Sequence, residues 1–524
     1  EDGDPHEWWD RSSTPPMCSF PRFDLQESTY ALGLMADRTP AWREVYTEIL
    51  DEIAERSITY WAAVDWLSQF GNDPGRKDYP IEWKGTLIPE EFWGDYDAPG
   101  WTANGVSPWG MQPDPIGADG NLFFKGWLNL TQALHTYVSG EDKWASPFMA
   151  TGVDRTRFEW TQHQLVDHLF EQWTKTPMGP HCENTKSWPF CLSAAGLGLQ
   201  MYDNVFDKDS HSAYKSWLDY TKDKYYGFDK KGTLQWVTMY YDALKKHHHK
   251  IQPAHALAIA FYAKPQAPEF AELLYREGVR FLKWDNPAEP ISNQIGLADR
   301  MLALGLSVSK EFDDQITHER LRKFAEENFE PRYFGLNDSQ FGFWFNLGEN
   351  WPRGQLSALA MCAEVCEGGA WEKLFKEPNL TKYYSPTIHN VDFPAVGVRQ
   401  AWHDDDNGTL TFKIIDGNKT KSNQSTEICI SNVPDPEEIQ IICDGSIFNN
   451  FLIEPNGNVL IKTDVAAHSF QVKTGYFLPE EEKITMQRGI STNVSISPSS
   501  SKKRSGVVSR LLLSPALSSS CGCC

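Results

Sequence analysis

The sequence predicts a mainly α-helical fold, an (α/α)6 barrel (toroid), followed by a small C-terminal antiparallel β module. Between residues 20 and 384, apolar residues recur at helical spacing in about twelve segments, which would pair as inner and outer helices. From about residue 385 the apolar period shortens to two, as in strands. A helical solenoid is the alternative, but the helices show no fixed repeat length.

The clearest helical pattern lies within residues 41–70. Trp42, Val45, Ile49 and Ile53 follow one another at steps of three and four, with charged residues between them. Further helices are expected at 24–37, 121–139, 153–175, 190–205, 209–225, 252–263, 267–283, 292–307, 310–328, 352–366 and 369–376. Strands are expected at 396–399, 409–414, 427–430, 439–442, 451–453, 459–462 and 469–472.

Composition shifts divide the chain into an N-terminal extension (1–19), the barrel (20–384), the β module (385–480) and a disordered Ser-rich tail (481–524). Residues 72–120 interrupt the barrel with a stretch rich in Trp, Pro and Gly. Long ordered loops of this kind are usually functional, so this insertion is expected to form a rim or lid.

Charge and hydropathy exclude several classes of partner. The 49 basic and 71 acidic residues give a net charge of −22, which argues against binding nucleic acid or anionic membranes. No run of 18 apolar residues exists, so no membrane span is predicted. The 21 tryptophans suit a protein that binds sugars or terpenoids. We therefore expect a small-molecule substrate.

Two features indicate a secreted protein. The chain begins with Glu1 rather than Met, as a mature form or a trimmed chain would, and it contains several N-x-S/T triplets. The candidate glycosylation sites are Asn129, Asn337, Asn379, Asn407, Asn418, Asn423 and Asn493.

The strongest chemical motif is the segment from Met178 to Ala194, in which Cys182 and Cys191 flank a short loop that leads into a helix. Thiols titrate near neutral pH, so a facing pair could give a proton on one side and take one on the other. A disulfide that closes the loop, or two inert thiols, are the alternatives. Glu183 could orient the Cys182 thiol or face solvent.

Several other groups have ordinary structural explanations. The run Lys245–Lys250 is interpreted as a solvated loop, and Asp404–Gly408 as a hairpin turn. His255 could line a barrel mouth or be a satisfied core residue. The remaining candidates are the aromatic residues Trp344 and Trp351, as pocket walls or core, and a cross-strand disulfide between Cys429 and Cys443.

The paired-cysteine segment resembles that of the bacterial linalool dehydratase-isomerase family. Asp24 and Tyr30 are similar to an Asp and Tyr six residues apart in the family, and Asn121–Leu128 resembles its N-x-M-Y-S-G-H-L segment. The resemblance implies an (α/α)6 barrel, a ring-shaped oligomer, and dehydration or isomerisation of monoterpene alcohols with no metal or organic cofactor.

Two of the departures from this pattern bear on the chemistry. Trp127 stands where the family has its catalytic His, and Phe123 where it has Met. Trp donates a hydrogen bond or stacks on a cation, but it cannot shuttle protons. The resemblance then leaves Asp24, Tyr30, Cys182 and Cys191 as catalytic residues. His135 could replace the lost imidazole if it points inward.

The leading hypothesis is a cofactor-independent dehydratase, isomerase or cyclase that acts on a terpenoid-like alcohol. Phe123, Trp127, Trp188 and Phe190 would hold the apolar substrate. Locally, Asp24 with Glu27 also fits a helix capping box, and Tyr30 a core position.

A carbohydrate-active barrel enzyme and a non-catalytic binding protein are the alternatives. The first requires two facing carboxylates. Its candidate residues are Asp24, Glu27, Asp154, Glu159, Asp203 and Glu349.

Overall fold

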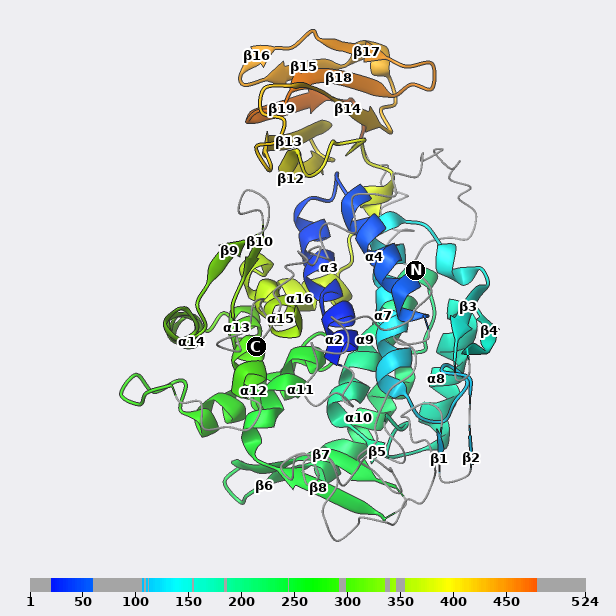
Figure 1. Cartoon of the computed structure of the whole chain (residues 1–524), viewed down its shortest axis with the longest axis vertical. Helices are drawn as coiled ribbons and strands as arrows, with labels where there is room; N and C mark the ends of the chain where they lie inside the picture. The colour runs from blue at the N-terminus through cyan, green and yellow to red at the C-terminus, as the bar shows by residue number, and fades with distance from the viewer. Residues whose placement is uncertain are drawn as a thin grey trace, which may run out of the picture. The chain divides into compact units, whose positions relative to one another are not determined.

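The structure is a computed structural model of the 524-residue chain (Figure 1). It describes residues 20–59, 106–107, 110–111, 113–152, 155–182, 186–243, 245–291, 298–334, 340–344 and 354–477. The predicted N-terminal extension, most of the 72–120 insertion and the 481–524 tail lie outside the described residues.

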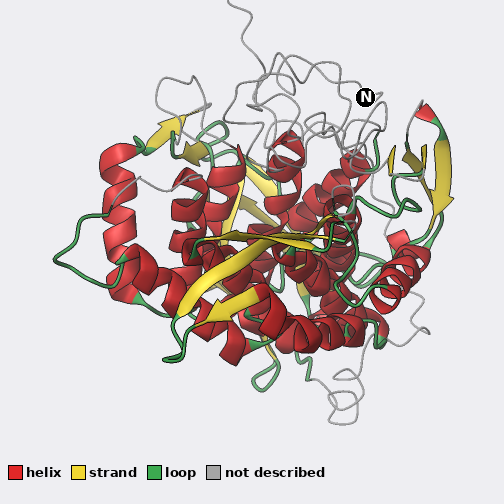
Figure 2. Cartoon of the chain, turned by 90° about the horizontal axis from the view of Figure 1, so that it is seen from below, coloured by secondary structure: helices red, strands yellow, loops and turns green. Residues whose placement is uncertain are grey.

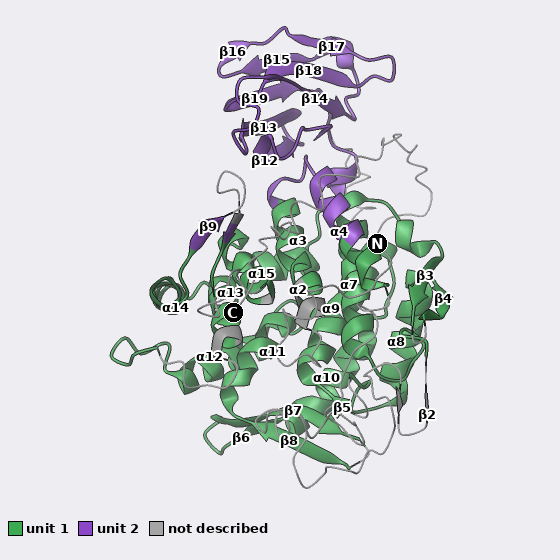
Figure 3. Ribbon diagram, in the orientation of Figure 1, with its two compact units in different colours: residues 1–37, 53–331, 342–380 green, residues 38–52, 332–341, 381–524 purple. Residues whose placement is uncertain are grey.

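The chain divides into two compact units (Figure 3). Unit 1 comprises residues 1–37, 53–331 and 342–380, and unit 2 comprises residues 38–52, 332–341 and 381–524. Figure 2 separates the many helices, in red, from the strands, in yellow. The prediction of a helical region combined with antiparallel sheets is confirmed, whereas closure of the helices into a toroid stays a prediction.

Most helices form where the apolar spacing predicted them, although several begin or end at other residues and the helix expected at 24–37 is divided into two. They are α2 (Phe20–Glu27), α3 (Thr29–Arg38), α4 (Glu44–Ser57), α7 (Leu122–Ser139), α8 (Gln162–Lys175), α9 (Pro189–Phe206), α10 (Ser212–Tyr225), α11 (Ala256–Ala263), α12 (Pro268–Leu282), α13 (Ala298–Glu311), α14 (Gln315–Asn328), α15 (Gly354–Val365) and α16 (Ala370–Lys376).

Helices α7 and α9 pack closely against each other in unit 1. A Cβ atom added to Gly126 would lie 2.4 Å from the Cβ of Ala195, and one added to Gly198 would lie 3.0 Å from the amide nitrogen of Leu130. Small residues therefore allow the two backbones to approach closely. Because both helices are buried almost throughout, they form the centre of the helical core.

The strands of unit 1 were not predicted. Short antiparallel pairs are β1 (Val106–Ser107) with β2 (Gly110–Met111), and β3 (Phe148–Thr151) with β4 (Arg157–Trp160). A further sheet contains β5 (Lys186–Ser187), β6 (Tyr226–Phe228), β7 (Leu234–Asp242) and β8 (His247–Ile251).

Two predictions fail at these strands. The helix expected at 153–175 begins only at Gln162, because Thr161 forms a capping box with Gln164 and strand β4 precedes it. The predicted loop at Lys245–Lys250 is largely strand β8, since its backbone pairs with the neighbouring strand β7.

Unit 2 contains a four-stranded and a five-stranded antiparallel sheet. One has the strand order β11 (Thr387–His389), β14 (Ser425–Ser431), β18 (Val459–Asp464), β17 (Phe451–Ile453). The other has the order β12 (Val396–Asp404), β13 (Thr409–Asp416), β19 (His468–Lys473), β15 (Gln440–Cys443), β16 (Ser446–Ile447). The remaining short strands are β9 (Arg332–Phe334) and β10 (Gln340–Gly342).

Alternate strand residues supply the core of the two sheets. Ile428 and Ile461 are buried on one sheet, and Phe412 and Phe470 stack with their ring centroids 4.7 Å apart on the other. The disulfide considered between Cys429 and Cys443 does not form, because the two residues belong to different sheets and both carry thiols.

The predicted hairpin turn at Asp404–Gly408 is confirmed between β12 and β13. The Asp404 carboxylate accepts the backbone N–H groups of Asp406 and Asn407 and so closes the turn. None of the described helices is long and apolar enough to cross a bilayer, in agreement with the sequence.

Candidate functional site

Cys182 lies against the amino end of helix α7. The backbone N–H of Phe123, in the first turn of this helix, points to the Cys182 sulfur at an N···S distance of 3.3 Å. The Asn121 N–H donates to the Cys182 carbonyl at 2.6 Å. A helix amino end carries partial positive charge, which favours a thiolate over a thiol at this sulfur.

The loop that contains Cys182 is anchored to the sheet of unit 1. The Cys182 N–H donates to the carbonyl of Lys186 at 2.8 Å, and Lys186 pairs in strand with Asp242 of β7. The ammonium of Lys186 lies 3.4 Å from the Asp242 carboxylate, and both side chains are buried. This buried ion pair fixes the loop, since breaking it would leave a charge without its partner.

Cys191 lies in the first turn of helix α9, which begins with Pro189. Its side chain is buried, as is that of Cys182, and both carry thiols. The structure therefore does not contain the disulfide that was considered as an alternative for this loop.

Aromatic residues adjoin both cysteines: the Phe123 N–H points at the Cys182 sulfur, and Phe190 directly precedes Cys191. The rings of Phe123 and Trp127 have centroids 4.2 Å apart, and Phe190, which directly precedes Cys191, lies 5.8 Å from Trp127. Tyr262 of α11 lies 5.1 Å from Phe190, and Tyr30 of α3 lies 5.8 Å from Tyr262. We call these five residues the aromatic cluster. Its faces are suited to an apolar group or to developing positive charge.

A directed chain of hydrogen bonds crosses the aromatic cluster. The indole N–H of Trp127 donates to the Tyr30 hydroxyl, which donates to the Tyr262 hydroxyl at 3.3 Å. Tyr262 in turn donates to Oε1 of Glu27, also at 3.3 Å. Because an indole can only donate, Trp127 sets the direction of the chain towards the buried Glu27 carboxylate.

Lys125 is a fully buried amine near the same thiol. Its Nζ donates to the Ala118 carbonyl at 2.7 Å and to Oε1 of Gln172 at 2.9 Å. Burial lowers the Lys125 pKa to about 7, although the charges of Asp119, Asp114 and Cys182 act to raise it. A buried amine that titrates near neutral pH is typical of functional sites.

We expect Lys125→Met to raise the free energy of unfolding at pH 7 by about 1–3 kcal/mol, because it removes a desolvated ammonium. In the unfolded chain a lysine titrates at about pH 10.4, above its folded pKa. The wild-type free energy of unfolding should therefore rise between about pH 7 and pH 10.

Urea unfolding at pH 7 and pH 9 measures this effect. Lys175→Met, on the exposed face of α8, is the matched control and should keep the wild-type pH dependence. An unchanged pH dependence in Lys125→Met would contradict the assignment of the titration to Lys125.

The histidines near the site are held neutral by burial. Burial lowers the pKa of His135 to about 4, and Lys143 adds to this effect. His135 lies two turns beyond Trp127 on α7, about 12 Å along the helix axis, so it does not take the place of the family's imidazole. Burial also lowers the pKa of His181, next to Cys182, to about 4.

The structure brings only some of the predicted residues to this site. Asp24 lies inside α2, and this contradicts the capping-box interpretation because the helix already begins at Phe20. Trp188 precedes α9 and packs against Tyr240 with ring centroids 5.0 Å apart. The side chain of Asp24 and the residues Glu183 and Trp351 lie outside the part that the structure describes.

Three other candidate residues belong to other segments of unit 1. His255 is half-buried at the start of α11, and Trp344 is buried beside Phe329, whose carbonyl accepts the Trp344 N–H. Asp203, considered as one of a carboxylate pair, instead accepts the N–H groups of Ser210 and His211. Its carboxylate therefore holds a loop.

The candidate glycosylation sites differ in exposure. Asn129 is completely buried on α7, so it cannot accept a glycan in this fold and that prediction is wrong. Asn379, Asn407 and Asn423 are exposed and Asn418 is half-exposed. Asn337 and Asn493 lie outside the described residues.

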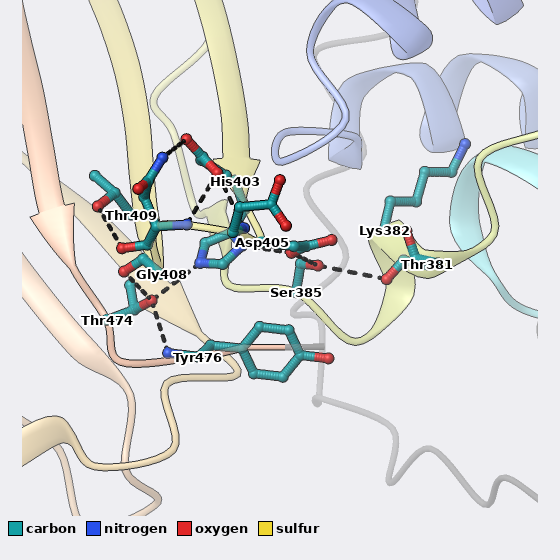
Figure 4. Close-up of polar contacts among 12 residues, drawn as sticks. Thr381, Lys382, Ser385, His403, Asp405, Gly408, Thr409, Thr474 and Tyr476 are labelled. Atoms are coloured by element: carbon teal, nitrogen blue, oxygen red, sulfur yellow. Dashed lines mark hydrogen bonds and ion pairs between the residues drawn. The ribbon is translucent and has the colours of Figure 1, made fainter. Parts of the chain in front are cut away.

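A second polar cluster lies within unit 2 (Figure 4). His403 contacts Oδ1 of Asp405 through Nδ1 at 2.7 Å and the Thr474 hydroxyl through Nε2 at 3.0 Å. Enzymes that use a hydroxyl as nucleophile often activate it with a His–Asp pair in the same order, carboxylate, imidazole and hydroxyl. However, the Thr474 hydroxyl is buried and also donates to the Gly408 carbonyl at 3.1 Å, so the cluster fastens the β12–β13 hairpin.

Comparison with known families bears on the first site. Residues 91–333 match the linalool dehydratase/isomerase family. The predicted resemblance is thereby confirmed for this segment. The match indicates an enzyme of the dehydratase/isomerase type. It includes Phe123, Trp127, Cys182 and Cys191, whereas Asp24 and Tyr30 lie before it and the sheets of unit 2 lie after it.

Sequence reasoning missed three residues of the site. Glu27 had been considered as a capping or paired carboxylate, and Tyr262 and Lys125 had no role. One signal was present for Lys125, which stands where the family segment has Ser, two residues before Trp127. For Tyr262 no local signal exists, because it meets Glu27 from 235 residues away in the chain.

Proposed function

We propose that the protein removes water from, or isomerises, a terpenoid-like alcohol by thiol-based acid–base catalysis, with no metal or organic cofactor. The observation that supports this best is the Cys182 sulfur at the amino end of α7, within hydrogen-bonding reach of Phe123. A backbone N–H that points at a sulfur stabilises its thiolate, and this sulfur lies in the segment that matches the family.

The proposed reaction begins when one of the two thiols protonates the substrate hydroxyl. Water then leaves and a carbocation forms, which the faces of Phe123, Trp127 and Phe190 stabilise. A base removes a proton from the neighbouring carbon, and a double bond forms. Isomerisation follows if water returns at another carbon, and cyclisation if the double bond of the substrate attacks the cation.

We also propose that the helices close into a toroid, because the centre of a toroid would shelter an apolar substrate from water. A carbohydrate-active enzyme would need two facing carboxylates. Of the candidates, the Asp203 carboxylate accepts the Ser210 N–H of a loop, and the Glu27 carboxylate accepts the hydrogen bond of Tyr262. No contact among the described residues favours a pair of sugar-cleaving carboxylates.

The function is tested with the full-length chain, kept reduced, and a panel of acyclic primary and tertiary allylic terpenoid alcohols. Gas chromatography with mass spectrometry should detect hydrocarbon or rearranged alcohol, with deuterium incorporated when the reaction runs in D₂O. A parallel panel of oligosaccharides should give no product. Turnover of a sugar together with inert alcohols would overturn the proposal.

A further inference from the structure

A cluster of potential metal ligands lies in unit 2, apart from the thiols discussed above. Cys443 ends strand β15, Asp444 follows it in the turn, and His468 begins the adjacent strand β19. One ligand atom from each residue lies within 4.8 Å of the other two. The sulfur of Cys443 is 3.6 Å from Oδ2 of Asp444, and Nδ1 of His468 is 2.8 Å from the same oxygen.

The surrounding contacts orient each of these groups. The other carboxylate oxygen of Asp444, Oδ1, accepts the Ser469 N–H at 2.9 Å, which leaves Oδ2 facing the sulfur and the imidazole. Nε2 of His468 contacts Oδ1 of Asp464 at 2.8 Å. A carboxylate behind a histidine is the usual support of a metal-binding imidazole, because it fixes the ring orientation.

The geometry points to a zinc-binding site: we propose that Cys443, Asp444 and His468 bind Zn²⁺, with Asp464 as the positioning residue for His468. Thiolate, imidazole and carboxylate together are a typical zinc ligand set. Ligand atoms about 2.0–2.3 Å from a tetrahedral ion lie roughly 3.3–3.8 Å from one another, so only small shifts of side chains are required. The two aspartates supply the negative charge that a divalent cation needs.

Binding would exchange protons for the ion. The Cys443 thiol loses its proton as the sulfur–zinc bond forms, and Nδ1 of His468 gives up any proton that it holds. Water can complete the fourth position because the Asp444 side chain is 52% exposed. Asp464 ends β18, so its contact with Nε2 of His468 joins the ligand cluster to the other sheet.

The proposal is independent of the catalytic function, and it is tested on the full chain after treatment with chelator and reductant. Zn²⁺ binding is measured by calorimetry and native mass spectrometry, and Co²⁺ serves as a spectroscopic probe of sulfur ligation. The chain should bind one zinc that is lost, with at least a 100-fold rise in Kd, in both Cys443→Ser and His468→Gln. Asp464→Asn should raise Kd about 10–100-fold.

Other thiols require matched controls. Cys429→Ser replaces a buried thiol in the same unit and should leave the binding unchanged. A chain with Cys521, Cys523 and Cys524 all changed to Ser should also retain this zinc. Thermal unfolding of the metal-free variants verifies that they fold. Zinc binding of equal stoichiometry and affinity in the wild type, Cys443→Ser and His468→Gln would overturn the proposal.

Discussion

Cys182→Ala is expected to lower kcat/KM for the terpenoid alcohol by about 10²–10⁴-fold, the usual contribution of a positioned acid or base. Cys182→Ser should be equally impaired, because a hydroxyl remains protonated where a thiol ionises. Initial rates measured by gas chromatography check this. Cys191→Ala should also lose most activity if one thiol donates the proton to the substrate and the other removes a proton from it.

The reactivity of the thiol, which can be measured without substrate, distinguishes a catalytic role of Cys182 from a purely structural one. Cys182 should react with iodoacetamide faster than Cys429, because the amino end of α7 and the nearby Lys125 favour its thiolate. Mass spectrometry of the labelled peptides measures both rates at several pH values. Lys125→Met should slow the labelling of Cys182 and leave that of Cys429 unchanged.

The matched control for activity is Cys429→Ala, in unit 2. It should turn over substrate at the wild-type rate. If Cys182→Ala retains wild-type activity, or if protein alkylated at Cys182 still turns over, the thiol is not the acid or base and the proposed mechanism fails.

Local patterns explain which parts of the fold could be predicted. Most helices follow the 3.6-residue period of their apolar side chains, and the strands of unit 2 follow a period of two. Strand β5 was missed because it pairs with a segment that lies apart in the chain, as Ser187 does with Tyr241, and β8 was missed because its sequence (His247–Ile251) shows no apolar alternation.

The residues of the site that form a local sequence motif could be predicted, and those that meet only through the packing of distant helices could not. Cys182 and Cys191 were recognised because their spacing and the following helix form a local motif. The meeting of Glu27 with Tyr262 depends on which helix faces pack together, and periodicity identifies a buried face but not its partner. Trp127 was interpreted as a loss of the proton-carrying imidazole, and its indole in fact donates to Tyr30.

Glu27→Gln is expected to lower kcat by about 10–10³-fold while leaving the fold intact. Glutamine has the size of glutamate and can still accept the Tyr262 hydrogen bond, but it cannot take up a proton. Since Trp127 only donates, a proton on Tyr30 can move along these three hydrogen bonds through Tyr262 to Glu27. The variant therefore tests whether Glu27 accepts a proton through this chain.

Steady-state rates as a function of pH test this role. The wild-type profile should have a limb that reports ionisation of an essential base, and Glu27→Gln should lose that limb. Tyr262→Phe interrupts the chain while Glu27 remains, so it should lower kcat without a comparable rise in KM. A merely structural role for Glu27 would change thermal stability and leave the shape of the pH profile unaltered.

The variant Trp127→His tests whether the direction of proton transfer matters, because it keeps the hydrogen-bond chain but adds a group that can accept a proton. An imidazole can accept as well as donate, so Tyr30 could then give its proton to residue 127 rather than to Tyr262. Activity in the double variant Trp127→His with Glu27→Gln should exceed that of Glu27→Gln alone, because the imidazole supplies a second acceptor. Equal activity of the two variants, together with a wild-type pH profile in Glu27→Gln, would show that protons do not leave the site through the tyrosines.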